Sequence, residues 1–196
     1  MDKKWLPLTV VLGVAGVAVV TASVWPDGDE PPLPQSLCHG ALSRETAELI
    51  DDGKGGDVSA NEAESKGKTT DYAVFRSCSV LRANADDDPR GVYQLLVQDT
   101  RSDSGRKNDS VPLGPGFTGW ALPDRAQVTL PADCAARMGS TAPYITASLS
   151  VPSQDEERLE RRGEEKPVDA DTATRNNATV MREVATRLAQ RYDCAD

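Results

Sequence analysis

The longest apolar stretch of the chain covers residues 5–25 and contains no charged side chain. A helix of this length spans about 30 Å, the thickness of the hydrocarbon core of a bilayer. Lys3 and Lys4 precede the stretch, whereas the first basic residue after it is Arg44. Because positive charge stays on the cytoplasmic side, the pattern predicts one transmembrane helix or signal anchor, with residues 1–4 as a cytoplasmic stub. The rest of the chain is then extracytoplasmic.

A cleaved signal peptide is the alternative interpretation of the same stretch. Val20, Thr21 and Ala22 satisfy the small-residue preference before a cleavage site, so cleavage after Ala22 stays open. The protein is then either a single-pass protein of the plasma membrane or a secreted one. Residues 26–36 are rich in proline and acidic residues, which predicts an extended stalk. An extracytoplasmic domain over residues 37–196 follows the stalk.

Alternation of apolar and polar residues predicts strands in the first half of this domain. Residues 72–81 alternate so that Cys78 points inward, and residues 92–98 predict a second strand that forms an antiparallel hairpin with the first. Residues 43–51 predict a short helix with a serine as its N-cap. Residues 53–70 lack either period, which indicates a loop.

The clearest periodicity of the domain is helical and lies at its C-terminal end. Over residues 174–192, Met181, Val184 and Leu188 fall on one stripe of a helix. Residues 153–171 are almost wholly polar and predict a solvated excursion, in which a frayed helix at 155–162 stays open. Further short strand candidates lie near Trp120 and at residues 127–130 and 144–151. The expected fold class is α+β: an antiparallel sheet of four to five strands packed by a short N-terminal helix and a longer C-terminal helix, preceded by one transmembrane helix.

Composition changes this picture in two ways. From Pro26 onward, Leu, Ile, Val and Phe supply 28 of 171 residues, about 16%, which is low for a domain stabilised by its core alone. The chain carries 22 basic and 31 acidic residues, for a net charge of −9. A nucleic-acid binder needs clustered Lys and Arg, and the sequence has no such cluster. Nucleic acid is therefore excluded as a partner.

The cysteines supply the stability that the thin core lacks. The chain has four, Cys38, Cys78, Cys134 and Cys194. In an extracytoplasmic domain they predict two disulfides, and the sequence leaves three connectivities open. We favour Cys38 with Cys78 and Cys134 with Cys194, because these pairs join the two predicted helical regions to the sheet. A zinc site is disfavoured, since no Cys-x-x-Cys motif exists and His39 is the only histidine.

Candidate catalytic and metal-binding motifs are weak. His39 would have to serve any Ser-His-Asp or Cys-His enzyme, and no Gly-x-Ser-x-Gly elbow supports it. Residues 65–68 match Ser-x-x-Lys without its companion motifs. Residues 51–62 have the glycine and glutamate of a calcium loop but glycines at its third and fifth positions. Three consecutive aspartates at 86–88 are typical of a solvated turn. We therefore expect no catalytic, cofactor or metal residues.

Four short motifs carry a resemblance that covers most of the chain. They are Leu37–Leu42 (LCHGAL), Gly119–Pro123 (GWALP), Leu130–Cys134 (LPADC) and a terminal helix that ends at Cys194. With these motifs the chain resembles actinobacterial membrane-anchored or secreted envelope proteins of unknown function. The excess of Arg over Lys and the richness in Ala, Asp and Gly suit a high-GC genome. The resemblance implies an envelope location and disulfides, and it implies no activity or site.

These observations favour a binding protein over an enzyme. The main hypothesis is a membrane-tethered extracytoplasmic module that binds an envelope protein or ligand and is held to the membrane by residues 5–25. A cell-envelope hydrolase is the first alternative, and it requires His39 or a carboxylate pair in a cleft. An accessory subunit of a membrane complex is the second, and it requires the transmembrane helix itself to contact the partner.

Overall fold

The structure is a computed structural model that describes residues 32–53, 55–64, 73–83, 89–152 and 168–194. All of them belong to one compact unit, Pro31–Asp196. The predicted membrane segment 5–25, the motif 65–68, the aspartates 86–88 and the candidate helix 155–162 lie outside the described residues. In the described part of the chain, no helix is both long and apolar enough to cross a membrane.

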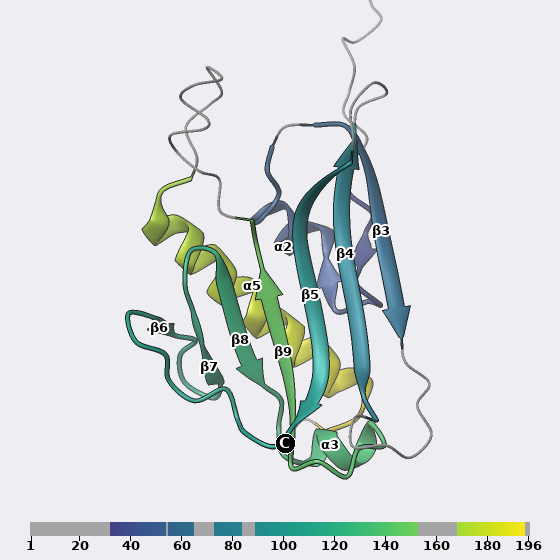
Figure 1. Ribbon diagram of the computed structural model, residues 1–196, viewed down its shortest axis with the longest axis vertical. Coiled ribbons are helices and arrows are strands. Elements are labelled where there is room, and N and C mark those ends of the chain that lie inside the picture. Colours follow the sequence, from purple (N-terminus) through teal and green to yellow (C-terminus); the bar gives the residue numbers. More distant parts are fainter. Residues whose placement is uncertain (1–31, 54, 65–72, 84–88, 153–167, 195–196) are drawn as a thin grey trace, which may run out of the picture. The chain divides into compact units, whose positions relative to one another are not determined.

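A seven-stranded antiparallel sheet forms the centre of the domain (Figure 1). In order across the sheet its strands are β3 (Asp57–Glu64), β4 (Phe75–Ala83), β5 (Arg90–Thr100), β9 (Tyr144–Ser150), β8 (Arg125–Thr129), β7 (Thr118–Ala121) and β6 (Val111–Pro112). The α+β class is confirmed, and β4 and β5 pair in the antiparallel sense that the hairpin prediction requires. The expected count of four to five strands is wrong, because two further strands extend the edges.

The edge strand β3 corrects the interpretation of residues 53–70 as loop. All eight of its residues pair with β4, from Asp57 opposite Ala83 to Glu64 opposite Arg76. Only Val58 is even partly buried, so no apolar alternation marks this strand in the sequence. Its structure comes from backbone pairing with β4, a long-range contact that composition does not encode. At the opposite side of the sheet, β7 packs closely on β8 at Gly119, where a Cβ atom would collide with the carbonyl of Gln127.

Three helices and a small hairpin accompany the sheet. They are α2 (Arg44–Glu48), α3 (Asp133–Arg137) and α5 (Ala170–Arg191), with β1 (Ser36–Leu37) and β2 (Leu42–Ser43). Ser43 caps α2 as predicted, with its Oγ accepting from the Thr46 N–H, although α2 ends at Glu48 rather than near residue 51. The terminal helix begins four residues earlier than predicted, at Ala170. No periodicity in the sequence predicted α3, which is a single short turn.

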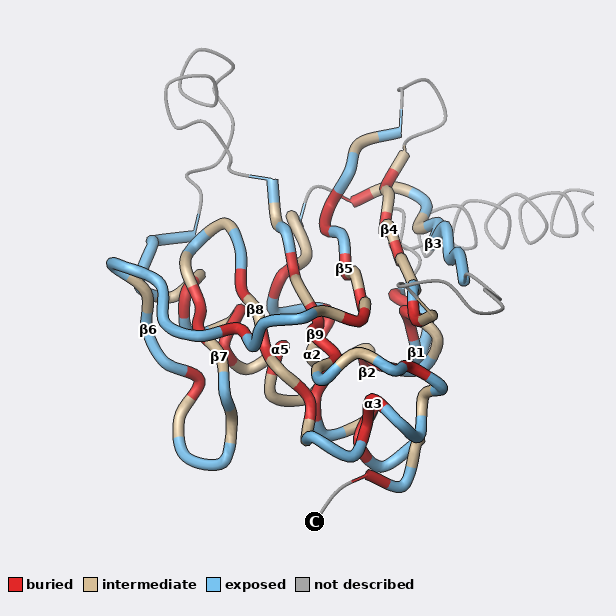
Figure 2. The backbone as a smooth tube through the Cα atoms, turned by 60° about the horizontal axis from the view of Figure 1, so that its bottom comes forward, coloured by how far each residue is buried: buried red, intermediate tan, exposed pale blue. Residues whose placement is uncertain are grey.

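The core lies between the sheet and α5. The long helix crosses one face of the sheet, and α2 lies on the same side (Figure 1). The predicted stripe of α5 is buried: Met181 and Val184 are inaccessible, and Leu188 is 2% exposed. The inward residues of the sheet, such as Val128 and Leu149, meet this stripe. Buried residues recur along the strands β4, β5, β8 and β9 (Figure 2).

Candidate binding surface

Two disulfides tie this helical layer together and to the sheet. Cys38, in the β1–β2 turn, bonds to Cys78 of β4 with an S–S distance of 2.05 Å. Cys134 of α3 bonds to Cys194, just after α5. These are the pairings favoured from the sequence, and the described residues hold no free cysteine. Because Cys78 points toward the β1–β2 hairpin, the residues that alternate with it along β4 point to the opposite face.

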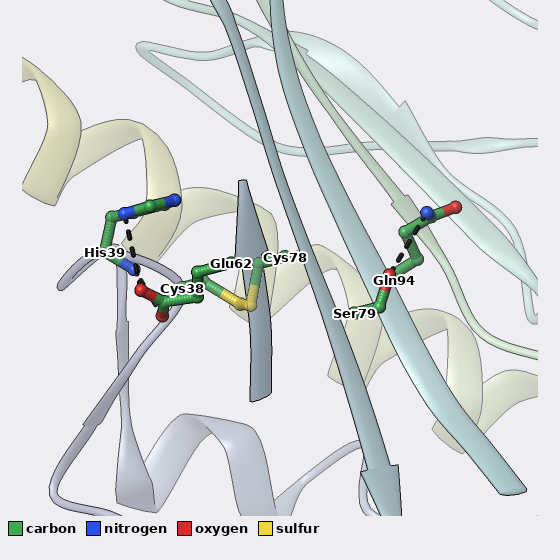
Figure 3. The surroundings of a disulfide bond; sticks show 6 residues. All are labelled: Cys38, His39, Glu62, Cys78, Ser79 and Gln94. Carbon is green, nitrogen blue, oxygen red and sulfur yellow. Dashed lines mark hydrogen bonds and ion pairs between the residues drawn. A yellow bond between two sulfur atoms is a disulfide. The ribbon is translucent and has the colours of Figure 1, made fainter. Parts of the chain in front are cut away.

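His39 holds the β1–β2 turn to the edge strand through Glu62 (Figure 3). Its backbone N–H donates to Oε1 of Glu62 over 2.8 Å, and its Nδ1 lies 3.3 Å from Oε2 of the same carboxylate. Its Nε2 is buried without a hydrogen-bond partner, so this nitrogen does not face a solvent-filled cleft. The carbonyl of His39 accepts from Arg191 at the end of α5. His39 therefore links the β1–β2 turn, β3 and the end of α5.

The first two acidic residues of the candidate calcium loop, Asp51 and Asp52, are paired with arginines. The guanidinium of Arg82 donates to both oxygens of Asp51 over 2.8 Å and to the carbonyl of Gly56 over 2.9 Å. Arg90, its register neighbour on β5, donates to Asp52 over 2.6 Å. Within the ranges that the structure describes, no group of three or more His, Cys, Asp or Glu side chains could hold a metal ion.

Tyr93 of β5 is a buried phenol close enough to Asp51 and Arg82 to interact with their charges. Burial raises its pKa, and the nearby Asp51 carboxylate raises it further, while Arg82 opposes them. Its hydroxyl has no hydrogen-bond partner. Such a group stays protonated at every physiological pH and cannot serve as a base.

The most extensive candidate site is the face of the sheet that lies opposite α5. The strand registers place 16 of its side chains in three central rows across the strands. The rows are Asn61, Ser79, Gln94, Ser150 and Arg125; Ala63, Ser77, Leu96, Ser148, Gln127 and Trp120; and Phe75, Gln98, Thr146, Thr129 and Thr118. We call these 16 residues the open face. No described helix covers it (Figure 1).

The chemistry of the open face is polar and almost uncharged. Eleven of its 16 residues are Ser, Thr, Asn or Gln, and one, Arg125, is charged. The whole chain is 27% charged, so a solvated face of ordinary composition would carry about four charges. Two neighbours within one row are hydrogen-bonded to each other, since Nε2 of Gln94 donates to Oγ of Ser79 over 3.3 Å (Figure 3).

A loop covers one end of the open face. The backbone N–H of Ser104 donates to Oγ1 of Thr129 over 2.7 Å, and the carbonyl of Ser104 accepts from Nε1 of Trp120 over 3.0 Å. The ammonium of Lys107 lies 4.9 Å from the centre of the Trp120 ring. Trp120 is therefore 8% exposed. The exposed part of the open face lies toward β4, β5 and β9.

Among the cavities of the described part of the chain, two flank the sheet, and the described residues that line them do not form a catalytic group. One, of about 620 Å³, is lined by residues 98–101 and 141–143. Its carboxylate, Asp99, already accepts from Oγ of Ser140 over 2.6 Å and from the N–H of Ala73 over 2.9 Å. The other, of about 580 Å³, lies between the ends of β7 and β8 and the last turns of α5. No second titratable side chain faces Asp99 through a hydrogen bond among the described residues.

Comparison of the chain with protein-family models, with curated proteins and with solved structures finds no match. The envelope resemblance drawn from the short motifs therefore stays a prediction. The open face was not predicted from the sequence, because the strand predictions rest on the apolar residues that point inward. The polar residues that alternate with the apolar ones could have indicated it. Examples are Gln94 and Gln98 on one strand and Ser148 and Ser150 on another.

Proposed function

We propose that this protein is a membrane-tethered, extracytoplasmic binding module whose binding surface is the open face. Residues 5–25 serve as the anchor and residues 26–36 as the stalk that holds the domain away from the bilayer. The observation that carries the proposal is the contrast between the two faces of the sheet. One is covered by α5 and tied by two disulfides. The other carries 11 hydroxyl or amide side chains and one charge, and of these 11 side chains Thr146 is buried and Thr129 is bonded to the covering loop.

The disulfides support an extracytoplasmic location, because structural disulfides persist in oxidising compartments and are rare in the cytosol. Protease treatment of spheroplasts that express the full chain tests this location. We expect the 37–196 domain to be released or degraded from intact spheroplasts, with its cysteines blocked against alkylation until they are reduced. A domain that is protected until the cells are lysed would contradict the proposed topology.

Capture from solubilised envelope tests the binding surface. The full chain, purified in mild detergent, is immobilised and incubated with envelope extract in three forms. These are the wild type, Ser148→Arg at the centre of the open face, and Thr186→Arg on the exposed side of α5 as the matched control. We expect a component retained by the wild type and by Thr186→Arg and lost with Ser148→Arg. Equal retention by all three forms would place the binding surface elsewhere.

A further inference from the structure

We infer that the open face binds a neutral, hydroxyl-rich polysaccharide strand of the cell envelope. The inference rests on the proposed function, and it names the class of ligand for that surface. Three features of the described residues carry it: the charge of the face, the hydrogen-bonding groups that it presents, and the position of its apolar side chains.

The charge of the face argues against a charged ligand. The protein as a whole has a net charge of −9, yet the three rows of the open face hold Arg125 alone among charged residues. Two further charged residues lie outside the rows: Asp57, farther along β3 on the same side as Asn61, and Lys107, over the covered Trp120. Anionic polymers are recognised by clusters of Lys and Arg, and cationic ones by clusters of carboxylates. The composition of the face matches neither case and complements a ligand without charge.

The hydrogen-bonding groups of the face match hydroxyl groups. A serine or threonine hydroxyl and a glutamine or asparagine amide each both donate and accept, as a sugar hydroxyl does. Neighbouring strands lie about 4.8 Å apart and alternate residues about 6.8 Å apart along a strand. The face therefore repeats similar groups at a spacing near the length of one sugar unit, which suits a polymer of similar units.

Apolar side chains lie among these polar rows. Phe75 is 39% exposed and ends one row, while Leu96 is half-buried beside Ser77 and Ser148. Sugar rings pack their C–H faces on such side chains while their hydroxyls bond to the polar neighbours. The covered Trp120 takes no part, so the footprint lies over β4, β5 and β9.

A protein partner fits this surface less well. The centres of protein interfaces are enriched in aromatic residues, Met and Arg and depleted in Ser. The middle of the open face has the reverse composition, with Ser77, Ser79 and Ser148 around Leu96. A sheet-to-sheet dimer through this face would bury these hydroxyls against copies of themselves.

The test is a binding titration of the full chain in mild detergent with defined polysaccharides. The neutral probes are soluble galactan, arabinan, mannan and amylose, and the anionic probes are polygalacturonate and heparin. We expect at least one neutral probe to bind at about 1 mM repeat units or below, with an affinity that does not change between low and high salt. Ser148→Arg should weaken this binding at least about tenfold, and Thr186→Arg should leave it unchanged.

A second pair of variants keeps the test valid if Ser148→Arg disturbs the fold. Gln94→Ala removes one exposed amide from the open face, and Gln190→Ala removes one from α5. We expect about three- to tenfold weaker binding with the first and no change with the second. Salt-sensitive binding of an anionic probe that Ser148→Arg strengthens would overturn the inference, as would failure of every neutral probe to bind. If the envelope capture still depended on Ser148 and retained a protein, the binding module would stand and only its ligand class would fall.

Discussion

The two faces of the central sheet are built from adjacent residues of the same strands but differ in burial and composition. On β5, Leu95 is 2% exposed on the covered face, whereas its neighbour Leu96 lies on the open face and is half-buried. The covered face is apolar and joined by disulfides, so packing dictates its residues. The open face is free of that constraint, and its lack of charge is therefore informative. A sheet face that is exposed to solvent and binds no ligand would be expected to contain Asp, Glu and Arg, which are abundant in this chain.

Removing a disulfide tests how far the covered face depends on its cross-links. Cys134→Ser together with Cys194→Ser opens a loop with a sequence separation of 60 residues. The entropy of the longer unfolded chain predicts a loss of about 4 kcal/mol in the free energy of unfolding. Urea unfolding followed by circular dichroism measures it. A loss below about 1 kcal/mol would show that apolar packing alone holds α5 on the sheet.

The same substitution on neighbouring residues compares the two faces directly. Leu95→Ala leaves a cavity in the core on the covered face and should cost about 2–5 kcal/mol of unfolding free energy. Leu96→Ala, on the open face, should cost less than about 1 kcal/mol. Urea midpoints of the two variants, measured side by side, give the difference. Equal losses would mean that the open face is packed in the folded protein and is not available to a ligand.

The covered face could be predicted from the sequence and the open face could not. The apolar stripe of α5 and the cap at Ser43 depend on residues three or four positions apart in the sequence. Both appear in the structure as expected. The edge strand Asp57–Glu64 lacks such a pattern, because pairing with β4 rather than burial makes it a strand. The rows of the open face depend on the register of seven strands, and register is a non-local property. Ser148 lies beside Leu96 only because β9 pairs with β5.

The smallest expected effect concerns the polar seam between α5 and α2, at the margin of the covered face. Burial raises the pKa of Glu183, but hydrogen bonds from Thr46, Ser43 and Arg187 outweigh it and hold this pKa below the ordinary value. The folded protein therefore binds fewer protons than the unfolded chain. The contribution of the Glu183 carboxylate to the free energy of unfolding is complete above the pKa of the unfolded chain, about 4.3. It is lost as the pH falls through the lower pKa of the folded protein.

Glu183→Gln isolates this contribution from those of the other carboxylates. The amide keeps an acceptor for the Ser43 hydroxyl, which lies 3.1 Å from Glu183, but it does not titrate. The difference in unfolding free energy between wild type and Glu183→Gln should be about 1 kcal/mol or less at pH 7 and should shrink toward zero as the pH falls below about 4. Urea unfolding from pH 7 to pH 3 follows it. A difference that stays constant over this range would show that the charge of Glu183 does not contribute to stability. The side chain would then act through its packing alone, as the residues of the apolar core do.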